Sequence, residues 1–166
     1  MEKTNASRIL ERLGINFELI EYDVDPDNLD AHHVAASLGQ DITTVFKTLV
    51  LHGDKNGHFV CVIQGDKEVD LKKAAKISGN KKVAMIPMKE LLPLTGYIRG
   101  GCTAIGMKKS FPVFLDSRAL DQELIHVSAG KRGLQIKLKP QDYVRAAKAT
   151  VGDLIKEDNP QEEDPT

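Results

Sequence analysis

The segment Thr44–Leu51 constrains the fold more than any other, because it reads as a buried β-strand that carries one cation. Side chains alternate between the two faces of a strand. Lys47 therefore shares one face with three aliphatic side chains, while Phe46, Thr48 and Val50 share the other. Both faces are apolar enough to be covered by the rest of the protein.

The position of Lys47 has three physical explanations. An unpaired ammonium among apolar side chains is costly. Its long side chain can extend past the edge of the sheet to water, or it can pair with a carboxylate. Alternatively, it points into a polar pocket that holds an anionic ligand.

Length and composition indicate one ordinary globular domain. The 166 residues are 41% hydrophobic, which is enough for one core. We expect a domain over residues 1–156 and a disordered acidic tail over 157–166. The polar start and the lack of an apolar run of about 18 residues predict a cytoplasmic protein without membrane contact.

The two cysteines do not indicate a metal or disulfide site. Cys61 lies in a strand pattern and Cys102 follows a Gly-Gly pair, and neither has zinc-ligand spacing. We expect both to be core residues, and we expect no metal and no cofactor.

Charge is distributed unevenly along the chain. Residues 1–45 carry three basic and nine acidic side chains, residues 46–156 carry 20 basic and 10 acidic ones, and residues 157–166 carry five acids. A basic middle favours a polyanionic partner such as RNA. Scattered surface lysines would give the same count.

Periodicity and turn residues predict a mixed order of elements. With their caps, the helices are expected over 5–13, 30–39, 70–79, 88–92 and 140–147. The strands are expected over 15–22, 44–51, 58–64, 82–86, 111–115, 124–127 and 134–138, with a last amphipathic stretch over 151–156. The predicted fold is a single α/β domain whose mixed, mostly antiparallel, barrel-like sheet is surrounded by helices.

Two glycine-rich segments could bring main-chain groups to a ligand. The first, residues 95–106, includes Thr95, Gly96, Gly100 and Gly101, and it could hold a substrate or form a bent β-segment. The second is a turn over residues 128–133 with a hydroxyl and two cations. Its candidate residues are Ser128, Gly130, Lys131 and Arg132. It is not a Walker A loop, because no Ser or Thr follows Lys131.

The helix that follows Asp70 carries Lys72, Lys73 and Lys76 on its outer side. They form either a solvated face or a patch that contacts phosphates.

The residue types in these segments limit the chemistry. Lys47 and the two glycine segments include no histidine and no carboxylate, so a Ser-His-Asp triad, a carboxylate pair or a metal-activated water is hard to assemble. A cation, main-chain groups and a hydroxyl can stabilise developing negative charge. The nucleophile would come from water or from the substrate.

Five motifs in order resemble the YbaK/EbsC family of aminoacyl-tRNA deacylases, which is related to the editing domain of bacterial prolyl-tRNA synthetases. The resemblance covers about residues 5–156 and rests on Phe46-Lys47-Thr48-Leu49, Asp70-Leu71-Lys72-Lys73-Ala74-Ala75, Thr95-Gly96-Tyr97 with Gly100-Gly101, Gly106-Met107-Lys108-Lys109, and Val127-Ser128 with Gly130-Lys131-Arg132-Gly133-Leu134. Two positions depart from the family pattern. Thr103-Ala104 replace a frequent Ser-Pro, and Gln135 occupies a position that is acidic in some relatives.

The resemblance implies removal of cysteine from Cys-tRNA(Pro), with prolyl-tRNA synthetase as a possible partner. The essential lysine of the family falls on Lys47, and its pocket residues fall on Tyr22, Gly100 and Ser128. We also expect Thr48, Thr95, Gly96, Gly101 and Gly130 at the substrate, and Lys72, Lys73, Lys76, Lys131 and Arg132 at the tRNA. In this family the cysteinyl thiol is thought to cleave its own ester.

Two other functions remain open. One is an Ala-tRNA(Pro) deacylase that uses water. The other is a noncatalytic module that binds tRNA or a synthetase through the basic middle of the chain.

Overall fold

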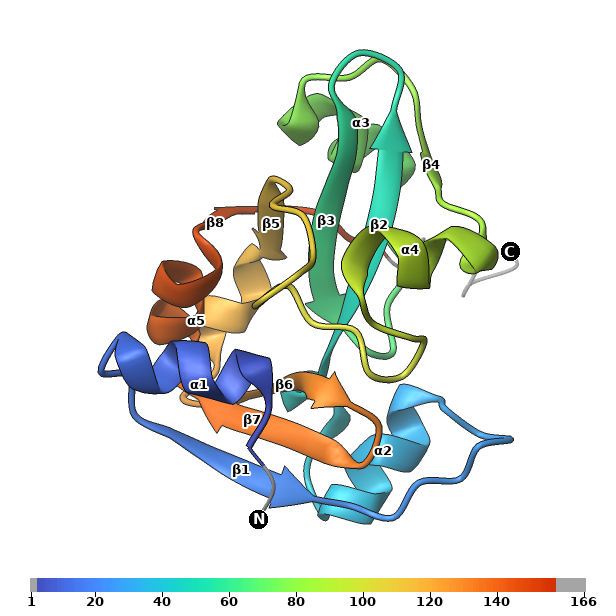
Figure 1. The fold of residues 1–166 in the computed structure, drawn as a ribbon. Helices are drawn as coiled ribbons and strands as arrows, with labels where there is room; N and C mark the ends of the chain where they lie inside the picture. The colour runs from blue at the N-terminus through green and yellow to red at the C-terminus, as the bar shows by residue number, and fades with distance from the viewer. Residues whose placement is uncertain (1–2, 158–166) are drawn as a thin grey trace, which may run out of the picture.

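The computed structural model describes residues 3–157, which form two β-sheets with helices packed around them (Figure 1). The α-helices are α1 (Asn5–Arg12), α2 (Ala31–Leu38), α3 (Leu71–Ser78), α4 (Leu91–Thr95) and α5 (Pro140–Ala147), and the short 3-10 helices are η1 (Ile42–Thr44), η2 (Met88–Glu90) and η3 (Ser117–Asp121). The strands are β1 (Phe17–Glu21), β2 (Phe46–Gly53), β3 (Gly57–Gln64), β4 (Val83–Met85), β5 (Val113–Asp116), β6 (Ile125–Lys131), β7 (Leu134–Leu138) and β8 (Ala149–Gly152). Residues 158–166 of the acidic tail lie outside the described residues.

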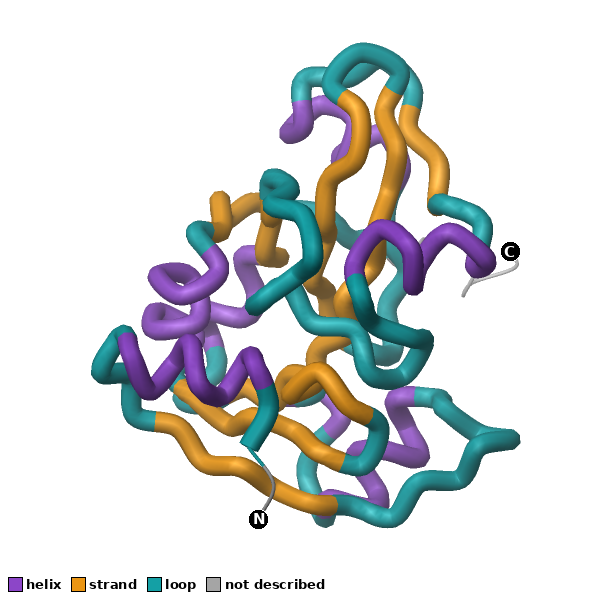
Figure 2. Tube along the Cα trace, in the orientation of Figure 1, coloured by secondary structure: helices purple, strands orange, loops and turns teal. Residues whose placement is uncertain are grey.

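The strands pair mostly antiparallel, as expected. The larger sheet has the order β4-β2-β3-β5-β8, in which β3–β5 and β5–β8 are parallel, and the smaller sheet is β1-β7-β6 (Figure 2). The prediction of a single mixed α/β domain is confirmed. The two sheets do not close into one barrel, because the described residues join them by one isolated bridge, between Val45, just before β2, and His126 of β6.

The hairpin of β2 and β3 is covered on both faces. Its register runs from Phe46 opposite Gln64 to Gly53 opposite Gly57. Phe46 and Val50 belong to one core cluster, which includes the smaller sheet and α1, whereas Leu51 belongs to a second cluster beneath α3. The two-sided burial predicted for this strand is confirmed.

The helix caps are also those that the sequence predicts. Asp30 and Asp70 accept hydrogen bonds from the first-turn N–H groups of α2 and α3. Gly39 and Gly79 close these helices at φ of 67° and 74°, in the left-handed region that glycine adopts without a steric cost.

Three local predictions need correction. The helix expected to end at Pro93 continues to Thr95, because Pro93 lies in the first turn, where its missing N–H has no helical acceptor. The turn expected over 128–133 is mostly strand. β6 continues to Lys131 through a bulge, in which Gly130 takes a φ of 97°. The stretch 151–156 begins in β8 and then runs extended to a bridge between Val69 and Ile155.

Both cysteines are free and buried, which confirms the prediction that they are core residues. Among residues 3–157 there is no helix with the length and apolar character that a bilayer crossing needs.

His126 is a buried histidine in β6. Its side chain is 1% exposed, Nδ1 lies 3.2 Å from the Thr44 hydroxyl, and Nε2 has no hydrogen-bond partner within the described part of the chain. Burial lowers the pKa of His126, and the nearby Lys137 ammonium lowers it further. The unfolded chain therefore binds a proton more readily than the folded one.

We expect the free energy of unfolding to decrease as the pH falls from about 7.5 to about 5.5, through the ordinary histidine pKa of about 6.5. His126→Gln keeps a donor for the Thr44 hydroxyl, whose own hydrogen goes to the Asp41 carbonyl, and should flatten this dependence in denaturant titrations. A small slope should remain, because burial also lowers the pKa of His58. His32→Gln, at an exposed position of α2, serves as the control. An undiminished slope in His126→Gln would contradict the assignment.

Candidate functional site

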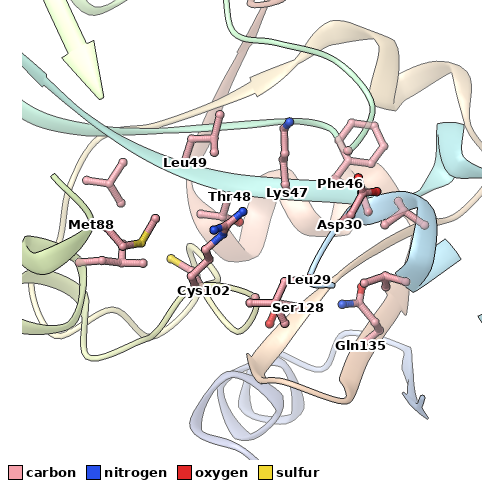
Figure 3. A pocket seen from close by; sticks show the side chains of 18 of the residues that line it. Leu29, Asp30, Phe46, Lys47, Thr48, Leu49, Met88, Cys102, Ser128 and Gln135 are labelled. Atoms are coloured by element: carbon pink, nitrogen blue, oxygen red, sulfur yellow. The ribbon is translucent and has the colours of Figure 1, made fainter. Parts of the chain in front are cut away.

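A cavity of about 400 Å³ opens along the outer edge of β2 (Figure 3). Its walls come from β2, the start of α2, the segment from β4 to α4, the turn over residues 98–101, which we call the Gly100 loop, and the β6–β7 pair. The volume lies within the range of about 300–1,000 Å³ that is typical of small-ligand pockets.

The cavity exists because β2 lacks a neighbour along the middle of this edge. Within the described residues, β4 pairs with β2 only at Leu51–Gly53, and the bridge to β6 lies at Val45, immediately before β2. The N–H of Gly65, which continues β3, donates to the Val45 carbonyl. The N–H of Ile86, which follows β4 on the opposite side of the strand, donates to the Val50 carbonyl. By the alternation of an antiparallel ladder, the main-chain groups of Phe46 and Thr48 point away from β3, toward the cavity.

The side chains of Lys47 and Thr48 leave β2 on opposite sides, and Cys102 and Ser128 lie on the Thr48 side (Figure 3). The cavity therefore extends around the edge of the strand rather than ending at Lys47. Lys47 is half-buried, and its ammonium forms no hydrogen bond or ion pair with any residue of the described range. Burial lowers the pKa of the Lys47 ammonium, while the carboxylates of Glu68, Asp66 and Asp30 favour its charged form.

The Gly100 loop is held in place by its own turn and by one arginine. The Gly101 N–H donates to the Ile98 carbonyl at 2.9 Å, and Gly100 takes a φ of 85°, as the third residue of a type II turn requires. The Arg132 Nε donates to the Arg99 carbonyl at 2.7 Å. A Cβ at Gly101 would lie 3.1 Å from the Arg132 main-chain nitrogen, so only glycine fits comfortably against β6.

Ser128 and Gln135 face each other across β6 and β7 at the floor of the cavity. The Ser128 hydroxyl accepts a hydrogen bond from the Gly130 N–H at 3.1 Å. Gln135 is 5% exposed, and its Oε1 has no partner among residues 3–157. Burial raises the pKa of the Cys102 thiol to about 12, so this sulfur stays protonated and is a poor nucleophile.

Five of the residues predicted at the substrate line the cavity: Tyr22, Lys47, Thr48, Gly100 and Ser128. The other four support its walls. Thr95 is buried and its hydroxyl donates to the Leu91 carbonyl, and Gly96 ends α4. Gly101 packs on the β6 main chain and Gly130 on the Tyr97 ring.

Several lining residues are not predicted from the sequence. The sequence marks Asp30 only as a helix cap and Cys102 only as a core residue. Met88 and Arg99 carry no sequence signal that places them at a site. Asp30 also brings a carboxylate to the cavity, whereas Lys47 and the two glycine segments supply none.

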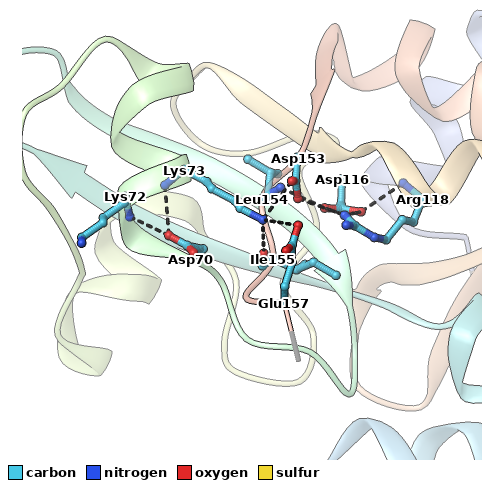
Figure 4. A network of polar contacts seen from close by, with 9 residues as sticks. All are labelled: Asp70, Lys72, Lys73, Asp116, Arg118, Asp153, Leu154, Ile155 and Glu157. Carbon is cyan, nitrogen blue, oxygen red and sulfur yellow. Dashed lines mark hydrogen bonds and ion pairs between the residues drawn. The ribbon is translucent and has the colours of Figure 1, made fainter. Parts of the chain in front are cut away.

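The predicted tRNA-contacting residues have different surroundings. Lys72 and Lys76 are exposed on α3. The Lys73 ammonium instead lies 2.8 Å from Asp153 and donates to the Ile155 carbonyl, within a network that ties residues 153–157 to β5 through Asp116 (Figure 4). Arg132 holds the Gly100 loop, and Lys131 lines a second cavity with Glu21 and Asp23.

If α3 contacts tRNA, the double variant Lys72→Ala/Lys76→Ala should weaken tRNA binding for all sequences alike. The slope of log affinity against log salt should decrease by about 1 for each phosphate that the variant no longer binds. Filter binding at several salt concentrations measures both quantities. Lys73→Ala should lower the melting temperature, because Asp153 keeps only its ion pair with Arg118 and the Ile155 carbonyl loses its side-chain donor. An unchanged salt slope in the double variant would remove α3 from the interface.

Among residues 3–157, no group of three or more His, Cys, Asp or Glu side chains is arranged to hold a metal ion.

Comparisons with known proteins place these features in context. The model of the aminoacyl-tRNA editing domain family matches residues 25–146. A protein of Enterococcus faecalis, named "Putative Cys-tRNA(Pro)/Cys-tRNA(Cys) deacylase EbsC", is 51% identical over 140 residues, which are 84% of this chain and 85% of that protein.

Two solved structures share the fold. One, described as a "putative trans-editing enzyme for prolyl tRNA synthetase", has a TM-score of 0.80 at 23% identity and covers 94% of this chain and 100% of its own. The other, a hypothetical protein called APE2540, has a TM-score of 0.84 at 22% identity and covers 92% of this chain and 100% of its own.

Proposed function

Because this chain belongs to the aminoacyl-tRNA editing domain family, we propose that it is a trans-acting deacylase that removes cysteine from mischarged Cys-tRNA(Pro). The name of the Enterococcus faecalis relative supports this substrate. The description of the structural neighbour supports action alongside a prolyl-tRNA synthetase, which we propose as a partner.

One observation carries the proposal: the described residues that line the cavity include no paired nucleophile and base. They contain no histidine, and the Ser128 hydroxyl accepts a hydrogen bond from the Gly130 N–H rather than facing a base. The Cys102 thiol is held protonated by its high pKa. A site of this kind suits a substrate that brings its own nucleophile.

In the proposed reaction the cysteinyl sulfur attacks its own ester carbonyl. The carbon–sulfur bond forms, the bond to the ribose oxygen breaks, and the thiol proton moves to that oxygen, so that the tRNA leaves with a free hydroxyl. Water later opens the cyclic thioester to free cysteine. Lys47 is the cation beside the ribose-ester and terminal phosphate region, where it stabilises developing negative charge.

The remaining residues position the substrate. The Gly100 main chain holds the aminoacyl end, since its turn is fixed by the Arg132 contact to Arg99. Ser128 and Tyr22 shape the wall around the side chain. Alanine and proline bring no thiol into this position, which gives the site its selectivity.

Asp30 favours a second candidate, the hydrolysis of Ala-tRNA(Pro) by water. Its carboxylate lines the cavity and could act as a general base. One carboxylate oxygen, however, already accepts the His32 N–H at the start of α2.

A panel of Cys-, Ala- and Pro-charged tRNA(Pro) tests the leading proposal. Cysteine should be released much faster than alanine or proline, because only cysteine carries a thiol. Lys47→Ala should slow cysteine release by about 100-fold or more, the usual effect of removing a charge-stabilising group.

Lys89→Ala, at an exposed position in η2, is the matched control and should leave the rate unchanged. Circular dichroism verifies that each variant is folded. If Lys47→Ala released cysteine at the wild-type rate, the role of the lysine would be wrong. If the wild type released alanine as fast as cysteine, the thiol mechanism would be wrong.

Asp30→Asn separates the two mechanisms. Asparagine caps helices as well as aspartate does, so α2 should stay intact. If the substrate thiol attacks, kcat for cysteine release should change by about threefold or less, because a carboxylate that only contacts the substrate ammonium affects KM. If Asp30 activates water, the rate should fall by about 100-fold.

A further inference from the structure

The cavity along β2 has two chemically different ends. Asp30 and Gln135 lie at one end, and Met88 lies at the other (Figure 3). The second end is formed by four apolar side chains, which we call the methionine wall: Met85, Ile86, Met88 and Leu91. Met85 is 45% exposed and Met88 is 59% exposed, so the wall is open to solvent.

The length of the cavity can be obtained from the strand itself. The Ile86 N–H bonds to the Val50 carbonyl, which fixes the wall beside Val50, while Asp30 lies near Lys47 at the start of the strand. Four residue steps separate Phe46 from Val50 and correspond to about 13 Å at about 3.3 Å per residue. The space is longer than an amino acid alone requires.

We propose that the methionine wall is the platform for the adenine of the terminal nucleoside of the charged tRNA. This inference rests on the proposed function, because an aminoacyl ester enters the cavity attached to that nucleoside. Its amino group, ester, ribose and base follow one another over a comparable length. With the ester beside Thr48 and the ammonium toward the carboxylate of Asp30, the base reaches Met85 and Met88.

The chemistry of the wall fits a nucleobase. Unpaired RNA bases stack on aromatic or guanidinium planes, and bases held in enzyme pockets also stack between apolar side chains. Methionine sulfur is polarisable and makes favourable contacts with aromatic rings. Isolated exposed apolar residues need no explanation, but two exposed methionines that share one cavity with a cation do.

Methyl NMR tests the contact directly. The chain has four methionines, so a protein labelled with ¹³C at the methionine methyls gives a simple spectrum. Titration with the amide-linked 3′-cysteinylamino-3′-deoxyadenosine should move the Met85 and Met88 methyls upfield by the ring current of adenine. Met107, which packs against the core, should not move. Cysteinamide, which lacks the nucleoside, should leave all of them in place.

Kinetics test the consequence. In Met85→Ala/Met88→Ala, kcat/KM for Cys-tRNA(Pro) should fall by about tenfold, as removal of one base-stacking platform predicts. The same constant for cysteine methyl ester, which has no adenine, should not change. Leu120→Ala, which alters an exposed apolar residue of η3, is the control.

Either of two results would overturn the inference. One is that the adenosine-bearing ligand shifts neither the Met85 nor the Met88 methyl, and the other is an unchanged kcat/KM for Cys-tRNA(Pro) in the double variant. Methyl shifts that depend on protein concentration without ligand would assign the wall to a second copy of the chain instead. Failure of the proposed function differs from both, because the wild type would then cleave neither Cys-tRNA(Pro) nor the methyl ester. The NMR titration would still show whether adenosine contacts the methionine wall.

Discussion

β2 is buried on both faces and yet unpaired along the middle of one edge, and the rest of the structure depends on this combination. The two core clusters hold the strand from above and below. Its edge is closed at one end by the Val45–His126 bridge and at the other by β4. An open strand edge normally invites pairing with another chain. Here the Gly100 loop, the β6–β7 pair and α2 surround it, so the free edge becomes the side of a cavity.

Lys47 gains its properties from this position. Removal of water from around the ammonium lowers its pKa, and three carboxylates at a distance keep its charged form favourable without pairing with it. An ammonium in an ion pair would have to break that pair before it met an anion. Lys73 shows the contrast, because its ammonium is already bound to Asp153 and to the Ile155 carbonyl. Two lysines in the same basic segment are thus suited to different tasks.

The cavity is organised by fixed main-chain geometry more than by reactive side chains. Arg132 fixes the Gly100 turn through one hydrogen bond to Arg99, and the close packing of Gly101 on β6 sets the width of the cavity. The floor of the cavity, at Ser128 and Gln135, is polar, whereas the methionine wall is apolar. A substrate with one polar and one apolar end therefore fits in one orientation. A rigid, directional site of this kind holds a reactive substrate in one orientation, which can contribute much of a barrier reduction when the nucleophile belongs to the substrate.

What the sequence by itself determined is what is encoded within a few neighbouring residues. The helix caps at Asp30 and Asp70, the hairpin after β2, the two-sided burial of that strand and the family resemblance all rest on local patterns or on ordered motifs. The tertiary structure alone decided which distant segments meet. It placed Asp30, Gln135 and Met88 at one cavity, made β3–β5–β8 parallel, and paired Lys73 with Asp153. These outcomes depend on the packing of segments far apart in the chain, and no local periodicity records how such segments will pack.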